Sequence, residues 1–395
     1  MAKTKQIPKP SEELVDYSRE RRKKRSVDTP FLLLVLILMT IGLIMLLSAS
    51  YARSYYEEQK AANVFVRQLF FAATGGAFML IMSRTPLRIF KKWSMRVLLI
   101  AVVLMLLVPV IGTDANGAKR WINLGLFTVQ PSEIAKISVI MAFSAMICKY
   151  RDKMKTWRYG VLPFAGILLA FAGLLALEPH LSATIIIMLL GASLMFLGGA
   201  PLSAFLVGGG GVIGLIVLYM NMFSYASDRI AAWRDPLHHE SGTAYQIKQS
   251  LYSIGSGGLS GVGLGESRQK YMFLPEEHND FIFSIVCEEL GYIGAITILV
   301  LFALLIIRGF WLATKCPDRY AFLLCCGVST LLSIQVVLNV SVVTNLIPCT
   351  GVSLPFFSYG GTALMLQLAE MGIVLSCSRT IPDKKKLMTA ENLQI

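Results

Sequence analysis

The chain has 395 residues, of which 55% are hydrophobic and 15% are charged, and its formal net charge at pH 7 is +13. An ordinary soluble domain carries about 25% charged residues, so this composition argues against a water-soluble enzyme and favours a membrane protein. The 7 cysteines include no Cys-x-x-Cys pair, and their spacing predicts neither a disulfide framework nor a metal site.

Residues 1–30 form a hydrophilic segment that holds 9 of the 37 Lys and Arg residues. Its basic run, Arg21 to Arg25, is typical of a segment that binds anionic lipid headgroups, and we do not expect it to bind nucleic acid. The apolar run that follows exceeds the length of a signal-peptide core, so we expect it to remain as a membrane anchor.

Ten stretches of the chain are predicted to cross a membrane, since a helix of about 20 residues spans a ~30 Å hydrocarbon core. In chain order they are residues 31–52, 68–83, 97–113, 132–148 and 159–177, two crossings within 181–227, residues 281–307, and two crossings within 320–378. Residues 198–201 and 348–355 mark the breaks inside the two longer stretches. The sequence therefore predicts an all-α, polytopic membrane domain over residues 31–378 with ten transmembrane helices.

The distribution of Lys and Arg sets the predicted orientation, because these residues are retained on the cytoplasmic side of short loops. With both termini inside, the cytoplasmic segments hold 26 of the 37 basic residues and the outer loops hold 10. Residues 1–30 and 379–395 are then cytoplasmic tails. The longest loop, about residues 223–280, lies outside between the seventh and eighth helices, and all 4 histidines are predicted to be outside.

Asp280 begins the eighth predicted span, and an ionisable residue at the rim of a span often marks a functional site. On a helix Glu288 shares the face of Asp280 while Glu289 points the opposite way, so Asp280 and Glu288 are expected to line one cavity. The alternative is that Asp280, which follows Asn279, only caps the helix N-terminus.

Two other spans contain acidic residues. Glu133 and Lys136 lie three residues apart after Pro131 and are expected to pair on one helix face. They could support an active site, or Glu133 could simply cap the helix with Lys136 neutralising it. Glu370, in the middle of the last span, is expected either to belong to a transport path or to form a hydrogen bond to a neighbouring helix.

The glycine-rich stretch at residues 255–265 lacks the Lys-Ser/Thr ending and the preceding strand of a nucleotide-binding loop. We interpret it as a turn-rich outer loop whose backbone amides could meet a lipid pyrophosphate. Candidate cations for an anionic headgroup lie in two outer loops: Lys119 and Arg120 with Trp121 in one, and Arg268 and Lys270 in the other. The alternative is that these side chains are only solvated surface.

Seven blocks of sequence, in order, resemble the shape, elongation, division and sporulation (SEDS) family, which includes FtsW, RodA and SpoVE. The blocks are residues 116–122, 130–133 with Lys136, 228–230, 233–236, 245–250 with 255–259, 274–283 with 288–291, and 354–361. The resemblance covers nearly the whole chain, and residues 261–270 are most similar to the FtsW and SpoVE division and sporulation branch.

Three positions depart from the usual pattern of the family. Residues 178–181 read Glu-Pro-His-Leu where many members carry Gln-Pro-Asp, which puts any role of that aspartate in doubt. Asn279 stands where many members have Thr, and residues 361–363 read Gly-Thr-Ala in place of Gly-Ser-Ser. Asp280 is retained.

The resemblance implies a glycosyltransferase that joins lipid II units on the outer face of the bacterial cytoplasmic membrane at the division septum. Its implied partners are a class B penicillin-binding transpeptidase and other divisome membrane proteins. In such an enzyme we expect Asp280 to act as the general base, with Glu133, Lys136 and Glu288 lining a supporting cavity. The expected substrate-binding residues are Lys119, Arg120, Trp121, Arg268, Lys270, Glu276, His278 and Ser358. No cofactor is required by the sequence, although a magnesium or manganese ion could bridge Asp280 and the pyrophosphate.

Two alternative functions stay open. A lipid II flippase would need charged contacts along a path between the leaflets, whereas the ionisable residues here crowd toward the outer ends of the spans. A non-catalytic scaffold would recruit the transpeptidase through its helices, and it would work without the Asp280 carboxylate.

Overall fold

The structure is a computed structural model that describes residues 26–59, 62–115, 118–125, 127–178, 180–211, 231–236 and 242–382. Nine helical segments in these ranges are long and apolar enough to cross a membrane. They are α2 (Thr29–Glu58), α3 (Asn63–Arg84), α4 (Leu87–Ile111), α5 (Pro131–Lys149), η2 (Trp157–Val161) continued by α6 (Leu162–Leu177), α7 (Leu181–Gly198), α11 (Ile282–Lys315), α12 (Arg319–Val343) and α13 (Gly361–Ser378). A short helix, η1 (Arg151–Lys153), precedes η2, and α10 (Gly242–Ser256) precedes the glycine-rich loop.

The predicted all-α, polytopic membrane architecture is confirmed, and nine of the ten predicted spans are present as helices. The other predicted crossing follows the break at Gly199 and begins as an apolar helix at Leu202–Gly211. Most of it falls on residues 212–230, which are outside the described ranges, so this span stays a prediction. The two predicted cytoplasmic tails lie almost entirely outside these ranges as well.

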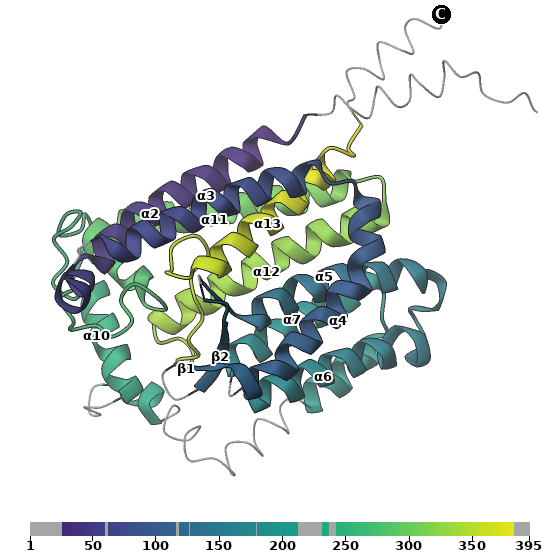
Figure 1. Cartoon of the computed structure of the whole chain (residues 1–395), viewed down its shortest axis with the longest axis horizontal. Coiled ribbons are helices and arrows are strands. Elements are labelled where there is room, and N and C mark those ends of the chain that lie inside the picture. Colours follow the sequence, from purple (N-terminus) through teal and green to yellow (C-terminus); the bar gives the residue numbers. More distant parts are fainter. Residues whose placement is uncertain are drawn as a thin grey trace, which may run out of the picture.

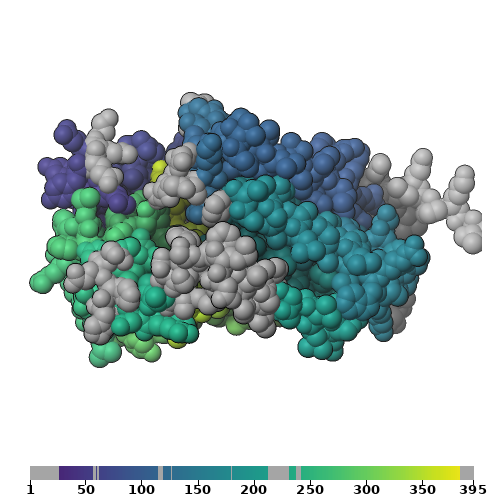
Figure 2. All heavy atoms as spheres, turned by 90° about the horizontal axis from the view of Figure 1, so that it is seen from below, coloured from purple at the N-terminus to yellow at the C-terminus, as the bar shows by residue number. Residues whose placement is uncertain are grey.

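The helices form two groups that meet at α12 (Figure 1). α12 packs against α11 and α13 on one side and against α5 and α7 on the other. Figure 2 shows α4 and α6, in blue and teal, covering one face of the body, with α10 and the loop after it, in green, at one end. α4 exposes aliphatic side chains such as Leu99, Leu106 and Val110, as expected for a helix surface that contacts lipid tails.

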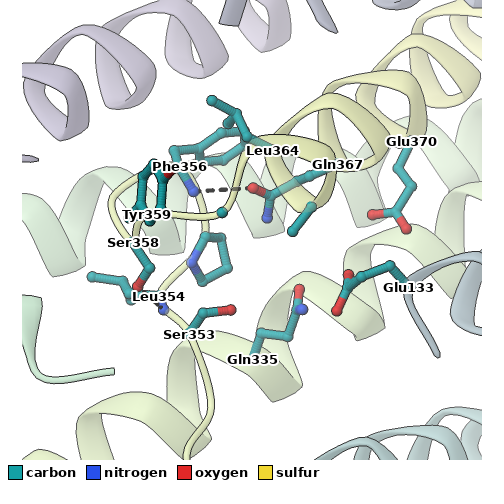
Figure 3. A pocket seen from close by; sticks show the side chains of 13 residues that line it. Glu133, Gln335, Ser353, Leu354, Phe356, Ser358, Tyr359, Leu364, Gln367 and Glu370 are labelled. Carbon is teal, nitrogen blue, oxygen red and sulfur yellow. Dashed lines mark hydrogen bonds between the residues drawn. The ribbon is translucent and has the colours of Figure 1, made fainter. Parts of the chain in front are cut away.

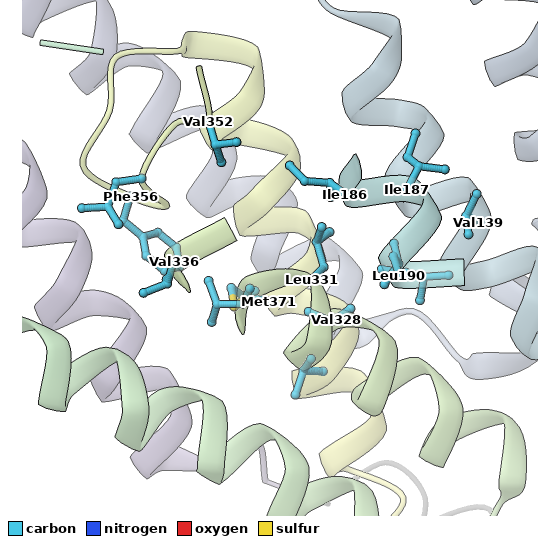
Figure 4. Close-up of a cluster of buried hydrophobic side chains, with 14 of the residues drawn as sticks. Val139, Ile186, Ile187, Leu190, Val328, Leu331, Val336, Val352, Phe356 and Met371 are labelled. Atoms are coloured by element: carbon cyan, nitrogen blue, oxygen red, sulfur yellow. The ribbon is translucent and has the colours of Figure 1, made fainter. Parts of the chain in front are cut away.

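The interior is a continuous apolar cluster between α5, α7, α12 and α13 (Figure 4). Ile187 and Leu190 of α7 and Leu331 of α12 are each at most 1% exposed. Phe356, in the irregular segment before α13, joins the same cluster. Because this packing joins the four helices near their middle, it fixes the frame in which the polar residues of their ends are held.

Among the described helices, α3 and α13 share the most extensive contact. A Cβ atom placed on Gly372 of α13 would lie 2.5 Å from the backbone oxygen of Met79 in α3. Small residues that let two backbones approach are a common way for helices to associate in lipid. The glycine therefore allows a contact that any larger residue would prevent.

The start of α2 and the end of α13 meet at the same end of the molecule. The Asp28 amide donates a hydrogen bond of 3.1 Å to the Ser378 hydroxyl. Both oxygens of the Asp28 carboxylate accept from Arg308 of α11, from Nε at 3.0 Å and from Nη2 at 2.7 Å. This three-helix clamp agrees with the prediction that both termini lie on one side of the membrane.

A small antiparallel sheet, which no sequence pattern predicted, connects α4 to α5. Its strands are β1 (Thr113–Ala115), β2 (Ala118–Asn123) and β3 (Thr128–Val129), in the order β1-β2-β3. The Thr362 hydroxyl of α13 donates to the backbone oxygen of Thr128 at 2.9 Å. The sheet is thereby attached to the outer end of α13.

Candidate functional site

Asp280 lies just before α11 and is held through its backbone. The Asn339 side-chain amide of α12 donates to the backbone oxygens of Asp280, at 2.8 Å, and of Val352, at 2.7 Å. α11 begins at Ile282 with Phe281 in the N-cap position, so Asp280 does not cap this helix. The capping alternative is therefore wrong, and the fold presents a partly exposed carboxylate at the outer end of the helix.

The Asp280 carboxylate points toward the segment that follows α12. A Cβ atom placed on Gly351 would lie 3.1 Å from Asp280 Oδ2 and 3.9 Å from the Ser182 hydroxyl oxygen. Ser182, at the start of α7, donates to the backbone oxygen of Thr350. Glycine at position 351 thus lets the carboxylate lie close to the backbone of this segment, and α7, α11 and α12 converge there.

The predicted pairing of Glu133 and Lys136 is confirmed. Lys136 Nζ lies 2.7 Å from Glu133 Oε2, and the two side chains are 4% and 17% exposed. Both lie in the first turns of α5, where Pro131 begins the helix. The pair places one positive and one negative charge inside the outer half of the membrane domain.

Glu133 borders a cavity of about 30 Å³ (Figure 3), which is room for about two water molecules. The cavity lies between α5, α12, α13 and the irregular segment at residues 353–360, and its lining includes Gln335, Gln367 and Glu370. Asp280 and Glu288 are not among the lining residues. The predicted supporting cavity therefore exists on the Glu133 side, whereas the expectation that Asp280 and Glu288 line one cavity stays a prediction.

Glu288 and Glu289 instead hold the glycine-rich loop against α11. Glu288 Oε2 accepts from the Ser267 hydroxyl at 2.5 Å and from the Ser253 hydroxyl at 3.0 Å, and Glu288 Oε1 accepts from the Arg268 amide at 3.0 Å. Glu289 Oε1 accepts from the Ser48 hydroxyl of α2 at 2.6 Å. Both carboxylates are 1% exposed, so their role is to anchor the loop from within.

The backbone of α11 breaks where the loop reaches it. Gly291 has φ 67° and ψ −170°, a conformation that only glycine adopts readily. The loop pairs with the helix on both sides of this break, through Val262 N to Glu288 O at 2.9 Å and Tyr292 N to Gly258 O at 2.9 Å. A helix without this break would leave the loop no backbone partners on α11.

The prediction that Lys270 binds substrate is not supported. Its side chain is 3% exposed, and Nζ lies 3.2 Å from Glu289 Oε1 and donates to the backbone oxygen of Gly265. A buried ammonium needs such partners, and they leave it turned into the loop and away from the outer surface. Arg268, by contrast, is exposed, as is Lys119 on β2.

The predicted binding residues between 276 and 278 form part of the loop that leads to Asp280. The Asn279 side-chain amide donates to Glu276 Oε2 at 2.5 Å, and Glu276 is partly exposed. His278 is 7% exposed, its ring packs against Tyr359, and its Nδ1 lies 3.4 Å from Glu277 Oε1. The structure therefore leaves Glu276 accessible, whereas His278 packs inside.

Ser358 was predicted to bind substrate, but its hydroxyl is used within the protein. It accepts from the Leu354 amide at 2.7 Å and donates to the backbone oxygen of Asn279 at 2.8 Å. The side chain is 7% exposed. Ser358 therefore joins the segment before α13 to the residue that precedes Asp280, and we reassign it from binding to positioning.

Residues 178–180 place two further ionisable groups near the site. Arg120 Nε of β2 donates to the backbone oxygen of Glu178 at 3.4 Å, and Trp121 beside it is partly exposed. Burial raises the pKa of the Glu178 carboxyl to about 7, against the opposing charge of Arg120. Burial, followed by the charges of Arg120 and Lys136, lowers the pKa of His180 to about 3. The departure from the family pattern was the only sequence signal for this pair.

Across the described ranges, no group of three or more His, Cys, Asp or Glu side chains is arranged to hold a metal ion. A divalent cation bridging Asp280 and a substrate pyrophosphate therefore stays a prediction, with Asp280 as the protein's contribution. His238, His239 and residues 228–230 of the family pattern lie outside the described residues.

Comparisons with known proteins give the family. Residues 28–382 match the model of the FtsW, RodA and SpoVE family, described as cell cycle protein. The chain belongs to this family. It is 37% identical to stage V sporulation protein E of Bacillus subtilis over 90% of this chain and 98% of that protein. It is 36% identical to the probable peptidoglycan glycosyltransferase FtsW of Trichlorobacter lovleyi, over 92% and 96% of the two chains.

Solved structures agree with this assignment. A chain from a structure described as the structural coordination of polymerization and crosslinking by a peptidoglycan synthase complex has a TM-score of 0.76 and 27% identity, over 89% of this chain and 98% of that one. The rod shape determining protein RodA of Thermus thermophilus has a TM-score of 0.67 and 27% identity, over 90% and 98%. These similarities cover the membrane domain from end to end.

Proposed function

We propose that this family member is a peptidoglycan glycosyltransferase that polymerises lipid II on the outer face of the bacterial cytoplasmic membrane. The observation that carries the proposal is the setting of Asp280. Its backbone is fixed by Asn339 and, through the neighbouring Asn279, by Ser358, while its carboxylate lies beside Gly351 and the residue is partly exposed. Relatives over nearly the whole chain are named probable peptidoglycan glycosyltransferases, which supports the same activity.

In the proposed reaction, the Asp280 carboxylate accepts the proton from the acceptor sugar's 4-hydroxyl. The resulting oxygen forms a bond to the anomeric carbon of the donor sugar, and the bond from that carbon to the lipid pyrophosphate breaks with inversion. A positioned base of this kind contributes about 10²–10⁴-fold to a rate. The undecaprenyl pyrophosphate leaves with the bonding electrons, so no nucleotide is consumed.

The leaving pyrophosphate needs nearby cations, because fixed positive charge stabilises negative charge that develops in the transition state. Arg268 and Lys119 are exposed, and Arg120 is partly exposed. Glu276 and Trp121, each partly exposed, would bind the sugar headgroup. Glu133 and Lys136 would act indirectly, by fixing the charge and shape of the cavity beneath.

We infer that the protein works in a complex with a class B penicillin-binding transpeptidase at the division septum. The similarity to a chain of a peptidoglycan synthase complex supports a partner of this kind. The flippase and scaffold alternatives remain distinct from this proposal, since neither requires a proton acceptor at position 280.

The test is polymerisation of purified lipid II by the full-length protein with its transpeptidase partner, comparing wild type with Asp280→Asn. Asparagine keeps the size of the side chain but cannot accept the proton, so we expect glycan polymer to fall at least 100-fold. Glu266→Gln, an exposed change in the glycine-rich loop, is the matched control and should retain full activity. Equal polymer from Asp280→Asn and wild type, at equal folding and complex formation, would reject Asp280 as the base.

A further inference from the structure

The cavity beside Glu133 contains polar groups that the protein itself leaves unsatisfied. Gln335 of α12 is 7% exposed and Glu370 of α13 is 5% exposed, and both side chains line the cavity (Figure 3). Neither has a hydrogen-bond partner among the described residues. Buried polar side chains normally have such partners, so these two indicate that the cavity has an occupant.

The carboxyl groups around the cavity outnumber the cations that the described residues bring to it. Glu133 and Glu370 bring two carboxylates, whereas Lys136 brings one ammonium and lies 2.7 Å from Glu133 Oε2. Glu370 is therefore a second carboxyl group inside a membrane domain, where it ionises only if a cation compensates its charge.

The lining suits a small cation better than it suits water alone. The carboxylates, the Gln335 carboxamide and the Ser353 hydroxyl offer hard oxygen atoms. Irregular backbone at membrane depth, such as residues 353–360, commonly lines ion sites in membrane proteins. The cavity of about 30 Å³ has room for one ion and about one water molecule. Magnesium retains several waters and would not fit.

We propose that this cavity binds one monovalent inorganic cation, of the size of sodium or potassium, between the carboxylates of Glu133 and Glu370. The ion compensates the second carboxylate, and Gln335 contributes its side-chain oxygen. It also links α5, α12 and α13 beneath the segment that carries Ser358. The site differs from any metal ion at Asp280, which does not line the cavity.

The test is thermal unfolding of the full-length protein in detergent, in sodium, potassium or choline chloride at one ionic strength and with a chelator of divalent ions. A ligand that binds only the folded state raises Tm saturably with its concentration. We expect a rise of about 3–6 °C in sodium or potassium over choline, which is too large for the cavity. Equal Tm values in the three salts would overturn the proposal.

Two variants assign the effect to this cavity. Glu370→Gln should lose the response to sodium and potassium, and its Tm in choline should equal or exceed that of wild type because the second charge is gone. Gln335→Leu keeps both carboxylates and should shift the half-saturating concentration upward by about tenfold. Glu266→Gln, on the exposed loop, should respond as wild type does. A response that persists in Glu370→Gln would place the ion elsewhere and overturn the proposal.

Discussion

Lys136 is the residue on which charge balance in the outer half of the membrane domain depends. It pairs with Glu133 at 2.7 Å, and its charge acts on both His180 and Glu370. A buried charge that loses its partner is far more costly than a pair that is absent altogether. Effects of single changes on stability must therefore be separated from effects on catalysis.

Lys136→Met should lower the free energy of unfolding by about 3 kcal/mol, because it leaves Glu133 without its cation. The double variant Glu133→Gln, Lys136→Met should recover most of that loss, since no unpaired charge remains. Unfolding measured by heat or denaturant in detergent gives the comparison. If the double variant is as unstable as Lys136→Met alone, the pair contributes through packing and not through charge.

Glu178 and His180 should give stability opposite dependences on pH. The pKa of Glu178 is raised to about 7 in the folded state, so between pH 4.5 and 7 the folded state binds more protons than the unfolded state. The free energy of unfolding therefore falls as pH rises over this range. The pKa of His180 is lowered to about 3 in the folded state, so between pH 3 and 6.5 the unfolded state binds more protons than the folded state. The free energy of unfolding therefore rises with pH over this range. In wild type the two effects largely cancel between pH 4.5 and 6.5.

Each single variant removes one of the two titrating groups, so its Tm shows the pH dependence that the other group causes. For Glu178→Gln, Tm should rise by several degrees from pH 4.5 to 6.5, whereas for His180→Gln it should fall over the same range. Parallel Tm profiles for the two variants and wild type would show that neither group is buried as the structure has it.

Among the secondary structure elements, the glycine-rich loop and α11 depend most on each other. The helix breaks at Gly291, where its backbone forms hydrogen bonds with the loop, and the buried carboxylates of Glu288 and Glu289 accept further hydrogen bonds beside this contact. The exposed Arg268 is held by this contact, since its amide donates to Glu288. The loop is thus a fixed part of the membrane domain, although its composition is that of a turn-rich segment.

Gly291→Ala should detach the loop, because the added Cβ atom would lie 2.2 Å from the Gly261 nitrogen at a φ of +67°. We expect a loss of about 1–3 kcal/mol in stability and faster proteolysis within residues 257–270. Gly255→Ala, where a Cβ atom meets open space, is the control and should be neutral. Unchanged proteolysis of the loop in Gly291→Ala would contradict the described contact.

At the scale of single elements, the sequence could predict the features that depend on neighbouring residues in the chain. Hydropathy and length located nine described spans, and the three-residue spacing located the Glu133–Lys136 pair. The strands β1 to β3 were missed because they are too short to have a period. Lys270 was misplaced because its burial depends on Glu289 and on a helix break far along the chain, which no local pattern contains.

On the scale of the whole molecule, the orientation in the membrane rests on the distribution of basic residues, and labelling can test it. Glu266 and Lys153 are both exposed, the first in the outer loop and the second between α5 and α6. In intact cells, Glu266→Cys should react with a membrane-impermeant maleimide above the background of wild type, whereas Lys153→Cys should not. The reverse result would invert the topology and remove Asp280 from the outer face.

The clamp formed by Asp28, Arg308 and Ser378 brings the start of α2 and the end of α13 together at one end of the domain. The packing of the helices therefore does not depend on where the chain is cut. A short linker could join the residues after Ser378 to those before Asp28, and new ends could be opened between α5 and α6 on the same side. A chain with this permuted order of helices should therefore assemble into the same domain.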